Sequence, residues 1–301
     1  MRRADNPDTT CSPTAMSFAK ELDELLRTGR ELPTLPDVVL ELRTALDDDE
    51  MADSDIAAII EKDPVITGRL LRLANSTHYR RGSEVTTVLG AIQRVGLREV
   101  RAICVVLAVV DAFSRVKGDL DLRHFWDHSA AVGRVAQLIN TKLPRDEGVG
   151  ADDVYVAGLL HDVGILLLDQ FFQERFRMNL HARIASDWPL WKVEQERMGM
   201  DHAEVGSLLV KQWALPEAMS QCIAGHHQPE RAPEEYQRSC RVILAAETLC
   251  TSLGADAGVE GPSQYDAFSV LQDLGMPDAE IDAFLTDIES VGISVRGAFA
   301  G

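Results

Sequence analysis

The 301 residues are acidic overall, with 48 Asp and Glu against 30 Lys and Arg, a formal net charge of -18 at pH 7 and a sequence pI near 4.8. A surface of this sign repels phosphate backbones, so non-specific nucleic-acid binding is not expected. The hydrophobic share of 46% excludes a disordered chain and is enough for a sizeable core.

The sequence indicates neither a membrane span nor secretion. Its most apolar stretch, 102–110, is far shorter than the ~20 residues that cross a bilayer. Arg2 and Arg3 are followed by polar residues and not by the apolar segment of a secretory signal. The cysteines show no CxxC spacing and are expected to be free thiols: Cys11, Cys104, Cys222, Cys240 and Cys250. A cytoplasmic protein is therefore expected.

Helical periodicity dominates the first half, and strand-like alternation is hard to find. Residues 1–16 are polar and aperiodic, which predicts a disordered tail. Start and stop signals for helices then follow in order. Apolar periodicity begins at Leu22, Pro36 is typical of a first helical turn, and Asp53 or Ser54 is predicted to cap the next helix. Asp63-Pro64 starts a further helix, Thr86 or Thr87 opens one that stops at Gly96, and an apolar helix follows over 97–113.

The second half holds seven of the eight histidines and begins after a charged stretch at 115–123. Helices are predicted over about 124–142, 151–172, 187–197, 202–212, 215–226 and 234–253, then, after a loop at 255–263, over 264–274 and 277–290. The predicted organisation is a tail (1–16), an N-terminal helical subdomain (17–114), a second helical subdomain (115–254) and a C-terminal helical pair (255–301).

Residues of metal-ligand type are spread over about 120 residues of this second half. They are His128, His161, Asp162, His202, His226, His227 and Glu247. Imidazole and carboxylate together suit Zn, Mn, Fe and similar divalent ions. Taken singly, each of these residues is more often a packed or capping residue than a ligand, and only the fold could bring them together.

The pair His161-Asp162 is predicted to lie on an apolar helix that ends at Gly164. A buried carboxylate there must be hydrogen-bonded or metal-bound, since an unpaired one costs several kcal/mol. Neighbours on a helix diverge by about 100°, so the two side chains are not expected to face one way as a simple pair. They could still flank one ion.

Short motifs run in order along the chain: LPTLP at 32–36, IEKDP at 60–64, LLRLANS at 70–76, AIQRVG at 91–96, FWDHS at 125–129, GLLHDVG at 158–164, HAEVG at 202–206, WALP at 213–216 and HHQP at 226–229. With these motifs the sequence resembles the HDOD family, a divergent relative of the HD phosphohydrolase superfamily. The resemblance covers about residues 20–290.

The resemblance implies an all-α fold in which an N-terminal helical bundle packs on an HD-like helical domain. It implies a divalent metal site, for Fe, Mn, Zn or Mg, whose ligand positions map onto His128, His161, Asp162, His202, His226 and His227. The terminal carboxylate maps onto Glu247, where the family pattern usually has Asp. Glu also ligates divalent ions but reaches further, which changes the geometry of the site.

The order of the histidines also resembles the HD-GYP phosphodiesterases of cyclic di-GMP. In this chain Ile165 stands where that group has a lysine after its His-Asp-x-Gly segment, and no Gly-Tyr-Pro follows His226-His227. Isoleucine cannot supply the positive charge that a phosphate needs. Hydrolysis of cyclic di-GMP is therefore not the expected activity.

Two functions stay open. The resemblance implies a non-catalytic signalling or regulatory module whose partners are other signalling proteins or a nucleotide ligand. The alternative is a metal-dependent phosphohydrolase or phosphodiesterase acting on a nucleotide or a cyclic dinucleotide, with metal-activated water as the nucleophile. The retained ligand set favours metal binding, whereas the missing lysine and Gly-Tyr-Pro favour regulation. No sensor, output or DNA-reading domain is recognised, so a signal is expected to pass by non-covalent contact.

Overall fold

The computed structural model describes residues 13–29, 32, 38–39, 41–42, 51–76, 79, 82–114, 117–143, 151–261 and 263–291. Over these residues the protein is all-α and has no strand, as predicted. The helices are α1 (Pro13–Thr28), α3 (Asp53–Ile60), α4 (Pro64–Ala74), α5 (Val88–Val95), α6 (Leu97–Ser114), α7 (Leu122–Lys142), α8 (Ala151–Leu160), α9 (Val163–Phe171), α10 (Gln173–Ile184), α11 (Leu190–Met198), α12 (His202–Gln212), α13 (Glu217–Gly225), α14 (Glu234–Ser252), α15 (Ala267–Asp273) and α16 (Asp278–Val291).

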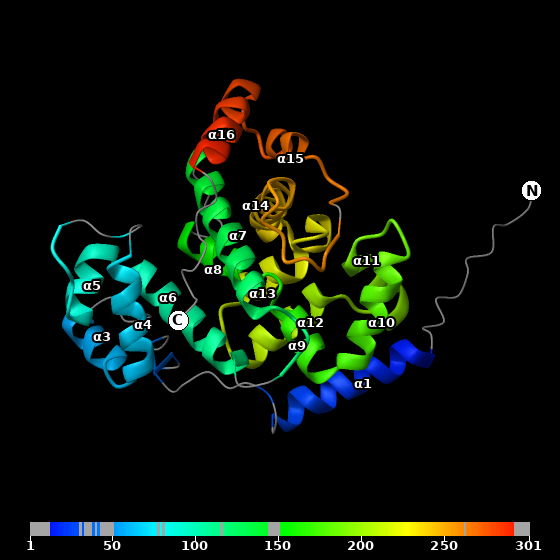
Figure 1. The fold of residues 1–301 in the computed structure, drawn as a ribbon, viewed down its shortest axis with the longest axis horizontal. Coiled ribbons are helices and arrows are strands. Elements are labelled where there is room, and N and C mark those ends of the chain that lie inside the picture. The colour runs from blue at the N-terminus through cyan, green and yellow to red at the C-terminus, as the bar shows by residue number, and fades with distance from the viewer. Residues whose placement is uncertain are drawn as a thin grey trace, which may run out of the picture.

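Helices α3 to α6 form an N-terminal bundle beside a larger helical domain (Figure 1). Two predicted caps set its geometry. Asp63 accepts hydrogen bonds from the first amides of α4 and is followed by Pro64, which needs no amide donor. Thr87 caps α5 in the same way. Helix α6 then runs out of the bundle and packs against α8, which joins the two parts.

Two details of the bundle differ from the sequence analysis. Helix α3 begins after Ala52, which has no capping side chain, so neither Asp53 nor Ser54 caps it. Gly96 ends α5 with a φ of +98°, as a terminal glycine should, but its ψ of 145° lies outside the left-handed helical region. Cys11 and the predicted helix start at Pro36 lie outside the described residues.

Helix α1 lies along the larger domain, although its residues belong to the predicted N-terminal subdomain (Figure 1). The Phe18 ring meets the ring of Phe172 edge-on, with centroids 5.0 Å apart. Arg175 forms an ion pair with Glu21 at 2.8 Å. The domain boundaries themselves stay predictions.

The helix predicted over 151–172 is wrong in one respect, because α8 ends at Leu160 and α9 begins at Val163. Helix α10 was not predicted at all. It buries only Phe176 and Asn179, so it carries too little apolar periodicity to be found in a sequence. By length and composition the stretch Val154–Phe171 could cross a membrane, but 89% of it is buried, which assigns it to the core.

The larger domain is built around the tight pairing of α7 and α8. A β-carbon at Gly133 would lie 2.7 Å from the carbonyl oxygen of Tyr155, so only glycine permits this approach. Helix α14 crosses α7, while α12 packs against both α9 and α13. The arrangement brings the middle of α7, the α8–α9 turn, the start of α12, the end of α13 and the middle of α14 around one point.

The remaining predictions about the interior hold where the structure describes them. The apolar segment of α6 is buried from Ile103 onwards, apart from the partly buried Val105. Four of the cysteines are buried free thiols, as expected: Cys104, Cys222, Cys240 and Cys250.

Candidate metal centre

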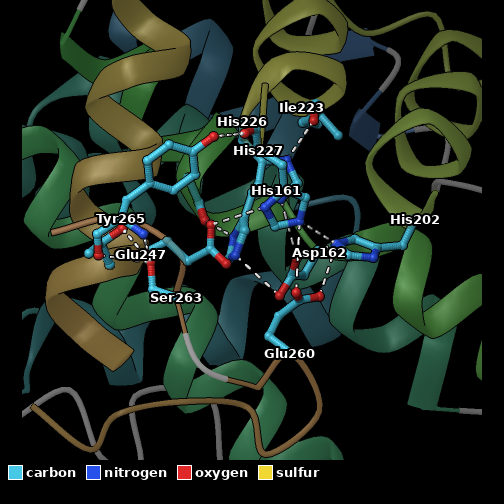
Figure 2. Close-up of polar contacts among 12 residues, drawn as sticks. His161, Asp162, His202, Ile223, His226, His227, Glu247, Glu260, Ser263 and Tyr265 are labelled. Carbon is cyan, nitrogen blue, oxygen red and sulfur yellow. Dashed lines mark hydrogen bonds and ion pairs between the residues drawn. The ribbon is translucent and has the colours of Figure 1, made fainter. Parts of the chain in front are cut away.

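All seven residues singled out in the sequence meet at that point (Figure 2). Helix α7 contributes His128, and the α8–α9 turn contributes His161 and Asp162. The start of α12, the end of α13 and the middle of α14 supply the others: His202, His226, His227 and Glu247. Every one of these side chains is buried.

Asp162 is the centre of the cluster, with none of its surface exposed. Its Oδ2 atom faces one pair of imidazoles, with His161 Nε2 at 3.2 Å and His128 Nε2 at 3.8 Å. Its Oδ1 atom faces a second pair, with His202 Nε2 at 3.4 Å and His226 Nε2 at 3.6 Å. A carboxylate placed between two sets of ligands is suited to bridge two cation positions.

The turn between α8 and α9 allows His161 and Asp162 to face the same point. Sequence analysis placed both on one continuous helix, where they would diverge. Instead the His161 ring donates from Nδ1 to the carbonyl oxygen of Gly158 at 2.7 Å, and α9 restarts with Asp162 at its N-cap position. Breaking the helix thus removes the 100° divergence that a helix would impose between neighbouring side chains.

Three of the imidazoles are held with Nε2 directed at the centre. Their Nδ1 atoms lie 2.7 Å from backbone carbonyl oxygens: His128 on Ala255, His161 on Gly158 and His226 on Ile223. A carbonyl only accepts, so Nδ1 must carry the hydrogen, and in the neutral ring Nε2 is left with a free lone pair. This is how proteins orient histidines that ligate a metal.

Most atoms that point into the centre have no hydrogen-bond partner among the described residues: His128 Nε2, His161 Nε2, His226 Nε2, both oxygens of Asp162, Glu247 Oε2 and Glu260 Oε1. The exceptions are His202 Nε2 and His227 Nε2, which lie 2.8 Å apart. One buried polar group left alone costs roughly 1–3 kcal/mol, and a charged group costs more. Divalent cations held between these atoms would satisfy them, so the donor set fits such ions.

Two carboxylates of the centre were missed by the sequence analysis. Glu194 of α11 is fully buried, and its Oε2 accepts from His202 Nδ1 at 2.7 Å. Glu260, in the loop after α14, places Oε1 3.2 Å from His202 Nε2 and Oε2 4.0 Å from His227 Nε2. Neither belongs to a recognisable motif, so no local signal could have identified them.

Burial and charge act in opposite directions on the pKa values of Asp162 and His202, whereas burial and the neighbouring imidazoles both lower the pKa of His227. Burial alone would raise the pKa of Asp162, but the imidazoles of His161, His202 and His226 outweigh it and hold the pKa well below its usual range. Burial lowers the pKa of His227 strongly, which favours its neutral form. Burial alone would lower the pKa of His202, but the carboxylates of Glu260 and Glu194 raise it well above its usual value.

Comparison with known proteins agrees with the resemblance. The model of the HDOD domain family matches residues 32–229. The chain belongs to the HDOD family. Among solved structures, an HDOD domain protein of unknown function from Geobacter sulfurreducens is 28% identical and superimposes with a TM-score of 0.78, over 95% of this chain and 97% of that one.

Two more distant relatives of this HDOD chain extend the comparison. A structure from Shewanella amazonensis SB2B, named "Putative phosphohydrolase", is 23% identical, with a TM-score of 0.73 over 94% of this chain and 98% of that one, and shows the shared fold alone. An uncharacterized protein of Treponema pallidum (strain Nichols) is 27% identical over 252 residues. That match covers 84% of this chain but only 47% of the relative, so the HDOD chain spans about half the length of the curated relative.

The Glu194 carboxylate orients His202 in this HDOD protein, and its removal should weaken metal binding. We expect Glu194→Gln to lower the affinity for Zn²⁺ or Mn²⁺ by about 10-fold, because groups that hold a ligand imidazole typically contribute 10–100-fold. Competition with a chromophoric chelator measures this affinity. Glu196→Gln is the matched control, since Glu196 is exposed on the same helix and carries the same charge. Equal affinities in the two variants would contradict the role of Glu194.

Proposed function

We propose that this HDOD chain is a regulatory module that binds a divalent metal ion at the cluster around Asp162 and does not hydrolyse nucleotides. The observation that carries the proposal is the set of buried nitrogen and oxygen atoms without hydrogen-bond partners that converge on one point. Imidazole favours Zn and Fe, and carboxylate favours Mn and Mg, so the mixed set suits Fe, Mn or Zn better than Mg.

A bound ion would supply positive charge among Asp162, Glu247 and Glu260, and would join helices that are far apart in the sequence. The proposed ligands are His128, His161, Asp162, His202, His226, His227 and Glu247. They come from α7, the α8–α9 turn, α12, α13 and α14. Because the unfolded chain has no such site, the binding free energy adds to the folding free energy.

Access to the centre supports the non-catalytic part of the proposal. A cavity of about 20 Å³ reaches it, lined by His227, Glu247 and Glu260 among others. The Trp191 ring stacks on His227 at 5.7 Å and forms part of the cavity wall. Small-molecule sites typically measure roughly 300–1,000 Å³, so a nucleotide does not fit in this cavity. A second cavity of about 150 Å³ touches only His227 of the cluster.

Family membership supports the regulatory part of the proposal. We expect the signal to pass by contact with other signalling proteins or a nucleotide ligand in the cytoplasm. Ile165 agrees with this expectation, because its side chain is fully buried in the core and offers nothing to a phosphate.

The proposal is tested by metal content and hydrolysis in one preparation. Protein purified without a histidine tag, in buffers free of added metal and chelator, should contain close to one or more equivalents of Fe, Mn or Zn by inductively coupled plasma mass spectrometry. The loaded protein should leave nucleotides and cyclic dinucleotides intact. Failure to bind metal even after reconstitution would contradict the proposed metal binding. Hydrolysis that disappears in Asp162→Ala would instead establish the phosphohydrolase alternative.

A further inference from the structure

Residues 255–261, here called the strap, follow α14 toward α15, and the side chain of Glu260 reaches the metal centre (Figure 2). We infer that the strap is a latch that closes this centre with a ligand of its own, the carboxylate of Glu260. The inference rests on the proposed metal binding and adds to it a residue and a mode of closure.

Glu260 has the position of a ligand and not that of a loop residue. Only 7% of its surface is exposed, although it lies in an irregular segment. Its two oxygens face His202 and His227, and its Oε1 atom has no hydrogen-bond partner. Ligand atoms of Glu260, His227 and Glu247 lie within 4.8 Å of one another. A buried carboxyl group is costly unless its charge is compensated. Coordination to a cation would offset that cost.

The strap is held in place from two sides. At its start, the carbonyl oxygen of Ala255 accepts the Nδ1 hydrogen of His128 on α7, so the strap also orients that ligand. At its end, the carbonyl oxygen of Glu260 accepts from the amide of Leu190 at the start of α11. Between them, Val259 is buried. The strap therefore spans from α7 to α11, and Glu260 lies at the second attachment.

The same residues form the outer wall of the narrow cavity that reaches the centre. Glu260 and Gly261 line it together with Tyr265, whose hydroxyl donates to the carbonyl oxygen of His227 at 3.2 Å. A catalytic metal site keeps one position open for water or substrate. Here the carboxyl group of Glu260 lines the entrance, where it would take up such a position on a bound ion. Lifting the strap would at once remove a ligand, release His128 and widen the entrance.

The strap also carries residues that do not face the centre, since Asp256 and Gly258 face solvent while Glu260 faces inward.

The experiment compares Glu260→Gln with Asp256→Asn in the full chain. Both variants replace one carboxyl group of the strap by an amide, but only Glu260 faces the centre. Zn²⁺ affinity is measured by competition with a chromophoric chelator, and the release rate by mixing the loaded protein with excess EDTA. We expect Glu260→Gln to weaken affinity by about 10-fold or more and to accelerate release by a similar factor. Asp256→Asn should stay within about 2-fold of the wild type, as expected for a carboxylate that does not contact the ion.

Hydrogen exchange provides a second readout that does not depend on affinity. Amides of the strap should be protected in the loaded wild type and in Asp256→Asn, and should exchange faster in loaded Glu260→Gln. Should Glu260→Gln fail to fold by circular dichroism, Glu260→Asp, which keeps the charge but shortens the reach, takes its place with the same expected direction. If the Glu260 variant matches Asp256→Asn in metal affinity, release rate and hydrogen exchange, the proposed role of Glu260 is wrong, while the proposed metal binding is not affected. If the wild type binds no Zn²⁺, both are wrong.

Discussion

Asp162→Ala is expected to abolish stoichiometric metal binding while leaving most of the helical content in place. The side chain presents one oxygen to His128 and His161 and the other to His202 and His226. Its loss removes the group shared by both halves of the cluster and leaves imidazoles facing one another. We expect affinity to fall by more than about 100-fold, beyond the 10–100-fold typical of residues that merely orient a ligand.

Metal content by mass spectrometry and helicity by far-ultraviolet circular dichroism measure the two parts of this expectation. Asp187→Ala is the control, because Asp187 is an exposed carboxylate before α11 and its removal changes the net charge equally. The control should retain wild-type metal content. Unchanged metal content in Asp162→Ala would show that Asp162 is not a ligand, whatever its position.

Gly164→Ala is expected to destabilise the fold by about 3 kcal/mol or more. A β-carbon at this position would lie 1.9 Å from the carbonyl oxygen of His202 and 2.7 Å from the amide nitrogen of Gly206. Both atoms are backbone, so no side chain can move aside. Helices α9 and α12 would have to separate. Because Asp162 and His202 sit at the starts of these helices, metal affinity should fall together with stability.

The free energy of unfolding in urea measures this effect, with a chelator present so that metal binding does not contribute. Gly68→Ala is the matched control. Gly68 lies inside α4, and a β-carbon there would meet nothing within 4 Å. Since alanine suits a helix better than glycine, the control should be neutral or more stable by up to about 1 kcal/mol. Equal stabilities of the two variants would mean that α9 and α12 are not in backbone contact.

Local signals located several helix starts correctly, although not that of α3. Asp63 with Pro64, Thr87 and the start of α12 at His202 are read from capping and periodicity, because a cap and the amides it satisfies lie within one turn. The family motifs supplied the seven ligand-type residues. The structure brings those seven together, and their role as ligands stays a prediction for the experiments above.

Sequence periodicity was misleading at the centre itself. The apolar run through His161-Asp162 predicts one helix, yet the helix is interrupted there. The reason is that His161 donates a hydrogen bond to the carbonyl oxygen of Gly158 and that Gly164 contacts the backbone of α12. Gly164 and His202, which form the second contact, are almost forty residues apart in the sequence. A helical pattern in the sequence extends over far fewer residues, so it cannot include both.

The sequence by itself determined that the protein is all-helical and which histidines and acids are candidates for a metal. Only the tertiary structure decided that Glu194 and Glu260 join them, that the helix breaks at Asp162, and that the centre is closed by the strap. The physical reason is that burial and ligation are properties of a point in space. A glutamate on a polar helix and one in a loop look solvent-exposed in sequence, and become buried only when α7, α11, α12 and α14 meet.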